Sequence, residues 1–94
     1  MKVYDIIIQP NTKLTSRLID TIMTEITTYF SVKCYAYGDC VTFAAENLRI
    51  SVEDIREDLV PKLLEHLDNI PWFSYQIANA FEVGDLLPSG AISF

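Results

Sequence analysis

Apolar positions in the stretch Ser51–Ile70 recur at steps of three or four residues, the period that places side chains on one face of an α-helix. These positions are Val52, Ile55, Leu59, Leu63, Leu67 and Ile70. The pattern predicts an amphipathic helix whose apolar face must pack against another part of the chain. Pro61 falls inside this stretch and removes a backbone hydrogen bond, so we expect a kink or break near Pro61 and a second helical piece that runs to about Asn69.

Three other segments have a recognisable period. Lys2–Gln9 is rich in β-forming residues and carries apolar side chains on both faces, which predicts a central strand. Ser16–Phe30 has helical spacing and a hydroxyl residue at its start to cap the first free amides. Trp72–Val83 reads as a last long strand, and Asn79 interrupts its alternation where a bulge would fit.

Val32–Ala45 predicts a hairpin, because two β-rich runs flank a Gly-Asp pair suited to a two-residue turn. This turn would set Tyr37 opposite Cys40. Cys34 and Cys40 would then point to opposite faces of the hairpin, so no disulfide is expected between them.

The order of these elements is strand, helix, two strands, helix, strand. It predicts an α+β, ferredoxin-like βαββαβ fold in which two helices cover one face of a four-stranded antiparallel sheet. The 94 residues are enough for one α/β-sandwich domain over 1–94. Residues 85–94 would form an extra edge strand or a tail.

The formal net charge of −6 changes the choice of partners. Such a charge repels nucleic acid and anionic membranes and attracts basic protein surfaces, although it also serves solubility alone. The chain has no apolar run long enough to span a membrane and no signal-peptide pattern at its start, so we expect a cytoplasmic protein.

Candidate catalytic chemistry is sparse. His66 is the only histidine, and the chain has two cysteines and three glycines. A thiol nucleophile would need Cys34 beside His66, but the predicted hairpin buries Cys34, and a buried thiol is inert. No phosphate-binding loop or metal-ligand motif is present. We therefore expect neither an enzyme nor a cofactor or metal site.

Carboxylates crowd the polar side of the predicted helix and form the candidate partner-binding site. They are Glu53, Asp54, Glu57, Asp58, Glu65 and Asp68, six of the thirteen in the chain. Spaced at helical intervals, they could occupy a basic groove built for a phosphate backbone. This predicts a small acidic inhibitor of a nucleic-acid-processing protein, of the anti-CRISPR, anti-restriction or nuclease-immunity type encoded by phages and mobile elements.

The open face of the predicted sheet offers a second surface. Tyr35, Tyr37 and Trp72 are candidate anchors for a homodimer or another protein contact. RNA stacking is disfavoured, because Asp5 lies on this face and Lys33 is the only base that the hairpin brings to it. The alternative function is a dimeric regulatory or small-molecule-binding ferredoxin-like domain.

Overall fold

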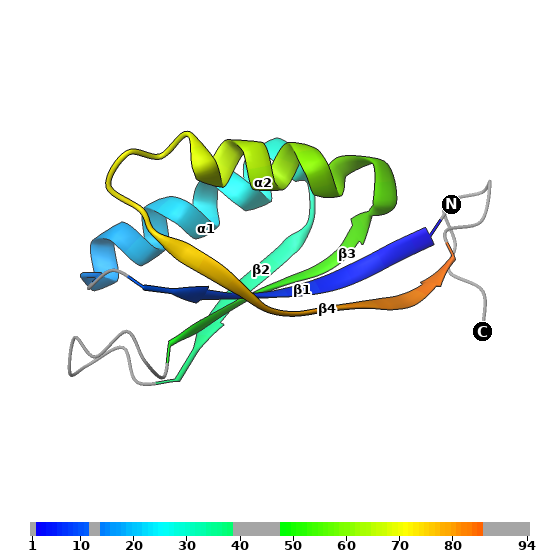
Figure 1. The fold of residues 1–94 in the computed structure, drawn as a ribbon, viewed down its shortest axis with the longest axis horizontal. Coiled ribbons are helices and arrows are strands. Elements are labelled where there is room, and N and C mark those ends of the chain that lie inside the picture. Colours follow the sequence, from blue (N-terminus) through cyan, green and yellow to red (C-terminus); the bar gives the residue numbers. More distant parts are fainter. Residues whose placement is uncertain (1, 12–13, 39–47, 86–94) are drawn as a thin grey trace.

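A computed structural model describes residues 2–11, 14–38 and 48–85 of the chain. Its elements are β1 (Lys2–Pro10), α1 (Ser16–Phe30), β2 (Lys33–Tyr37), β3 (Arg49–Arg56), the 3-10 turn η2 (Glu57–Leu59), α2 (Val60–Asp68) and β4 (Tyr75–Asp85). Both helices lie on one face of a four-stranded antiparallel sheet (Figure 1). The predicted α+β fold with βαββαβ order is therefore confirmed.

The strand order across the sheet is β2-β3-β1-β4. β3 lies between β1 and β2, and β1 lies between β3 and β4, so each helix crosses over one intervening strand. This order puts β1 in the interior of the sheet, as its two apolar faces predict. It leaves β2 and β4 at the two edges.

The core fills the space between the two helices and the sheet. Burying each of its large aliphatic side chains contributes about 1.5 to 3 kcal/mol relative to leaving that side chain in water. The fully buried ones include Ile22 and Ile26 from α1, Leu63 and Leu67 from α2, Ile6 and Ile8 from β1, and Ile50, Val52 and Ile55 from β3.

Local capping fixes both ends of α1. The Thr15 hydroxyl oxygen accepts a hydrogen bond from the Leu18 amide at 3.3 Å, which satisfies one of the free amides of the first turn. At the other end Ser31 turns into the left-handed region with φ 53°, and its amide donates to the Thr27 carbonyl at 3.0 Å. The predicted bounds of this helix are confirmed.

The predicted helix over Ser51–Ile70 is wrong in its first part, because residues 49–56 form β3. A β-bulge explains the misreading. Asp54, with φ 56°, lies at a shift in register where β3 carries one more residue than β1. The insertion places Ile55 three residues after Val52 with both side chains still buried, and three is also a helical spacing.

The second part of that prediction is confirmed. α2 begins at Val60 and ends at Asp68, with Pro61 in its first turn. A proline is tolerated there because the amides of the first turn have no partner within the helix. Pro61 therefore starts the helix, and η2 joins it to β3.

The predicted hairpin register is also wrong. Tyr37 lies opposite Arg49 instead of Cys40, because β2 pairs with β3. Residues 39–47, which include the predicted partner run, lie outside the described residues. Pairing with β3 places Cys34 opposite Val52 and Ala36 opposite Ile50, and both of these β3 residues are fully buried. Tertiary packing therefore sets the register in place of the local turn signal. The alternation within β2 is confirmed: Lys33, Tyr35 and Tyr37 are exposed, whereas Cys34 and Ala36 are half-buried.

β4 begins at Tyr75, later than predicted, because Trp72 and Phe73 form part of the connection from α2. The expected bulge near Asn79 is present as a register shift against β1 between Ile77 and Asn79. Residues 86–94, which hold most of the predicted extra strand or tail, lie outside the described part.

Candidate functional site

The six carboxylates predicted to bind a partner do not share one helical face. Glu53 and Asp54 lie on β3, Glu57 and Asp58 lie in η2, and Glu65 and Asp68 lie on α2. The premise of a carboxylate-rich helix is therefore corrected. The cause is the bulge in β3, which made a strand resemble the first half of a helix.

Three of these six carboxylates have partners within the chain. Exposed polar pairs of this kind contribute at most about 1 kcal/mol to stability, but they hold each carboxylate in one orientation. The contacts are Asp58 with the Arg56 guanidinium at 2.9 and 3.1 Å, Glu53 with the Tyr35 hydroxyl at 2.7 Å, and Asp68 with the Tyr75 hydroxyl at 2.6 Å.

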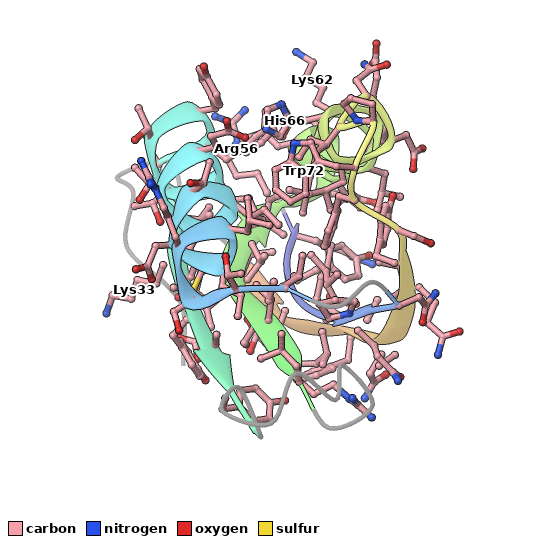
Figure 2. The ribbon with its side chains drawn as sticks, turned by 90° about the vertical axis from the view of Figure 1, so that its left-hand side faces the viewer. Lys33, Arg56, Lys62, His66 and Trp72 are labelled. Atoms are coloured by element: carbon pink, nitrogen blue, oxygen red, sulfur yellow. The ribbon has the colours of Figure 1, made fainter. Side chains whose placement is uncertain are left out.

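The three aromatic residues predicted for an interaction face are separated. Tyr35 and Tyr37 lie together on β2, with ring centroids 6.0 Å apart and exposed fractions of 47% and 45%. Trp72 lies in the connection between α2 and β4, beside the helices (Figure 2), and its ring contacts that of Phe73 at 6.2 Å. The two tyrosines remain a joint candidate without the tryptophan.

The β4 edge is the surface that sequence reasoning missed. β4 has 11 residues, pairs with β1 on one side, and has no other described strand along its outer side. Ile77, Phe81 and Val83 on it are 39%, 43% and 40% exposed. Natural edge strands are usually short or protected by charged residues, lysine above all, or by bulges. β4 contains neither lysine nor arginine, and its register shifts against β1 leave residues 79–82 as a regular stretch between them. The strand order alone would have placed it at the edge.

An apolar groove lies beside this edge, between the sheet and the start of α2. Its volume is about 280 Å³. This volume is near the lower end of the range of about 300 to 1,000 Å³ usual for small-molecule sites, and it would hold one or two side chains of a protein partner. The groove is lined by Tyr4 and Ile6 of β1, Ala80 of β4, Glu57 of η2, and Val60 and Pro61 of α2.

One carboxylate lines the groove and a second lies near it on β4. Glu57 lines it directly and forms no ion pair within the described residues. Glu82 lies opposite Tyr4 in the β1–β4 register, and its carboxylate is 3.7 Å from the Lys2 amino group. Glu57 is therefore the carboxylate in the groove lining, whereas Glu82 lies two residues along β4 from Ala80 and is paired with Lys2.

His66 links the two helices and does not lie free on a solvated face. Its Nε2 is 3.2 Å from the Glu25 carboxylate of α1. The rings of Tyr29 and Phe30 meet the imidazole edge-on at 5.3 and 6.1 Å. Figure 2 shows His66 between α1 and α2. This placement makes it part of the packing of the helix layer.

Cys34 is not activated as a nucleophile. Burial raises the pKa of its thiol to about 12. Its neighbours include Asp20 and Met23, in the first half of α1, whereas His66 contacts the last residues of that helix. Among the described residues, the contacts of His66 with one carboxylate and two aromatic rings do not include Cys34.

No protein-family model, curated protein or solved structure matches this chain. Among the described residues, no group of histidine, cysteine, aspartate and glutamate side chains is arranged to hold a metal ion. Neither described helix has the length and apolar character needed to cross a membrane.

Proposed function

We propose that the protein is a small acidic protein-binding module that holds its partner by adding a strand to β4. The observation that carries the proposal is the β4 edge, which is long, apolar and without a basic residue. In strand addition the backbone hydrogen bonds give affinity, and pockets for alternate side chains give specificity. The groove beside Ala80 would be such a pocket.

The partner we propose is a protein with a basic surface. A net charge of −6 speeds encounter with such a surface and repels acidic competitors. Proteins that process nucleic acid carry basic surfaces of this kind. We therefore propose, more specifically, that the protein inhibits one of them in the cytoplasm. Such inhibitors include the anti-CRISPR, anti-restriction and nuclease-immunity types.

Lysine substitutions on β4 test the proposal. The double variant Ile77→Lys/Val83→Lys places two charges on the edge, where they oppose strand addition. Tagged wild type and variant would be used to capture partners from nuclease-treated lysate of the producing cells, with elution by rising salt and identification by mass spectrometry. The β4 variant should lose the partner that wild type captures.

The matched control is Tyr37→Lys on the opposite edge strand, β2, which should retain that partner. Thermal melts would establish that all three proteins fold. A partner that binds the β4 variant as well as wild type, or that is lost only from the β2 variant, would overturn the role of β4.

A second candidate is a homodimer formed through the open face of the sheet. It is favoured by the exposed pair Tyr35 and Tyr37, since tyrosines are common interface anchors. Light scattering of wild type and Tyr35→Ser/Tyr37→Ser would test it. A dimer that the double variant dissociates would support this candidate, and a monomeric wild type would exclude it.

A further inference from the structure

We infer that the groove beside β4 selects a partner strand with a large apolar side chain and a basic side chain two residues away from it. This inference rests on the proposed strand addition and specifies its partner. It follows from the register of β4, from the size of Ala80 and from the charges in and near the groove.

The register places Ala80 and Glu82 on the same face of β4. Ala80 lies opposite Ile6 and Glu82 lies opposite Tyr4, and directly paired residues share a face. That face is the one covered by α2, because Ile6 belongs to the core and Tyr4 packs against it. A strand added outside β4 would also direct every second side chain to this face.

The small side chain of Ala80 leaves the groove accessible from the edge. Directly opposed side chains on neighbouring strands have Cβ atoms about 4.5 to 5.5 Å apart. A leucine or phenylalanine opposite Ala80 would therefore reach over the alanine methyl toward Val60 and Pro61, which form the α2 wall. An alanine or a polar residue at that place would leave the wall uncovered.

Charge specifies the neighbouring position. A residue two places along the added strand lies opposite Glu82, whose carboxylate is 3.7 Å from the Lys2 amino group in an exposed pair, so a basic residue on the partner would share that carboxylate with Lys2 or displace it. Glu57 in the groove lining adds a second carboxylate, and no lysine or arginine lines the groove. Both features favour arginine or lysine on the partner.

The same charges disfavour a second copy of this chain as the occupant. β4 contains acidic residues and no basic ones, so pairing two β4 strands would bring carboxylates together, with Lys2 of β1 the cation near Glu82 in each chain. Each chain also carries a net charge of −6, which opposes self-association. A basic partner has neither disadvantage.

The test is an NMR titration of the full-length ¹⁵N-labelled protein with a capped peptide, Thr-Arg-Thr-Leu-Thr-Arg-Thr. Its leucine and both arginines share one face of an extended strand. A matched peptide carries asparagine in place of leucine. The expected result is saturable shifts of β4 and groove amides, with about tenfold weaker binding of the asparagine peptide, a loss typical of one missing apolar contact.

Matched protein variants locate the contact. Ala80→Phe fills the groove and should weaken the leucine peptide about tenfold, to the level of the asparagine peptide. Ala78→Phe makes the same change on the same strand at a position that does not line the groove, and should leave the affinity within about twofold. Glu82→Gln should weaken binding several-fold and reduce its dependence on salt.

Several results would overturn the inference. These are equal affinity for the two peptides, an Ala80→Phe variant that binds as well as wild type, or no saturable shift at all. A concentration-dependent dimer that Ala80→Phe dissociates would assign the groove to a second copy. Nuclear Overhauser contacts between residues 86–94 and the groove in the free protein would assign it to the chain itself.

Failure of this inference can be told apart from failure of the proposed function. If the β4 lysine variant loses the captured partner but Ala80→Phe retains it, strand addition stands and the groove has no part in selection. If neither variant loses the partner, strand addition itself is wrong.

Discussion

At the scale of single residues, two side chains hold their protons unusually tightly. Burial raises the pKa of the Cys34 thiol to about 12. The pKa of the Tyr75 hydroxyl also rises to about 12, first through burial and then because the hydroxyl donates to the Asp68 carboxylate, which an ionised phenol could not do. Both groups therefore stay neutral in the folded protein well into the alkaline range.

Cys34 should react slowly with alkylating agents. A pKa about three units above that of a free thiol leaves about a thousandfold less thiolate at neutral pH. In a Cys40→Ser variant, iodoacetamide at pH 8 should modify Cys34 at least about a hundredfold more slowly than it modifies glutathione, as followed by mass spectrometry. A rate close to that of glutathione would contradict the burial of this thiol.

Tyr75 should make the folded state less stable at alkaline pH. Its folded pKa lies above its unfolded value, so its contribution is fully present below about pH 10 and is lost as the pH rises toward 12. Urea unfolding at pH 8, 10 and 11.5 would measure the free energy of unfolding. Tyr75→Phe should lose less stability over this range than wild type does, and equal losses would contradict the prediction.

At the scale of elements, the bulge in β3 decides how the strand fits the sheet. Asp54 adopts φ 56°, and its amide donates to the Asp5 carboxylate at 3.0 Å. In a regular strand Ile55, three residues after Val52, would point to the opposite face of the sheet. The extra residue shifts the alternation of side chains by one, so both face the core. The bulge therefore preserves the core contact at the cost of one strained residue.

Substitutions at Asp54 should report that strain. Glycine accepts a positive φ freely, so Asp54→Gly should keep or slightly raise the free energy of unfolding. Valine is β-branched and disfavours this region, so Asp54→Val should lower it by about 1 to 2 kcal/mol. Urea unfolding of both variants measures the difference, and an equally stable valine variant would argue against the positive φ.

The bulge also marks where sequence reasoning succeeds and fails. In α1, β1 and α2 the spacing of the apolar residues predicts the element correctly, because one unbroken repeat of apolar residues faces the core in each. Across Asp54 the repeat changes by one residue, and a local pattern cannot distinguish that change from a helix. Pairing of β2 with β3 depends on residues far apart in sequence, which a turn signal near Gly38 does not report.

The candidate site was predicted less well than the fold, for a related reason. The carboxylates are neighbours in sequence, but three different elements carry them. The groove joins Tyr4, Pro61 and Ala80, which come together only once the strand order is known. Exposed and half-buried side chains alternate along β2, which places Tyr35 and Tyr37 on one face. The sequence predicts this pattern because it depends only on neighbouring residues.

At the scale of the whole molecule, the net charge bears on how copies of the chain meet through the exposed β4 edge. The chain carries −6 at neutral pH and has a sequence pI near 4.5. Charge repulsion between copies is strongest well above that pH and vanishes near it. Because the described part of β4 has no lysine to protect its edge, we expect this net charge to oppose association through β4 at neutral pH.

Wild-type protein should therefore self-associate as the pH approaches 4.5. Light scattering would be followed from pH 7.5 to 4.5 for wild type and for Ile77→Lys/Val83→Lys. When each protein is measured at the same number of pH units above its own pI, wild type should scatter more. Thioflavin fluorescence should rise with the scattering, since the contact is strand to strand. Equal curves for the two proteins would place the association elsewhere on the surface.

The strand order also sets when this surface comes into existence. β1 precedes the other described strands in the chain, yet one of its edges has no described partner until β4 has emerged. A growing chain can pair β1, β2 and β3, but the apolar edge that β4 presents is absent until its residues have left the ribosome. If β4 binds a partner as proposed, that contact is restricted to chains completed at least through this strand.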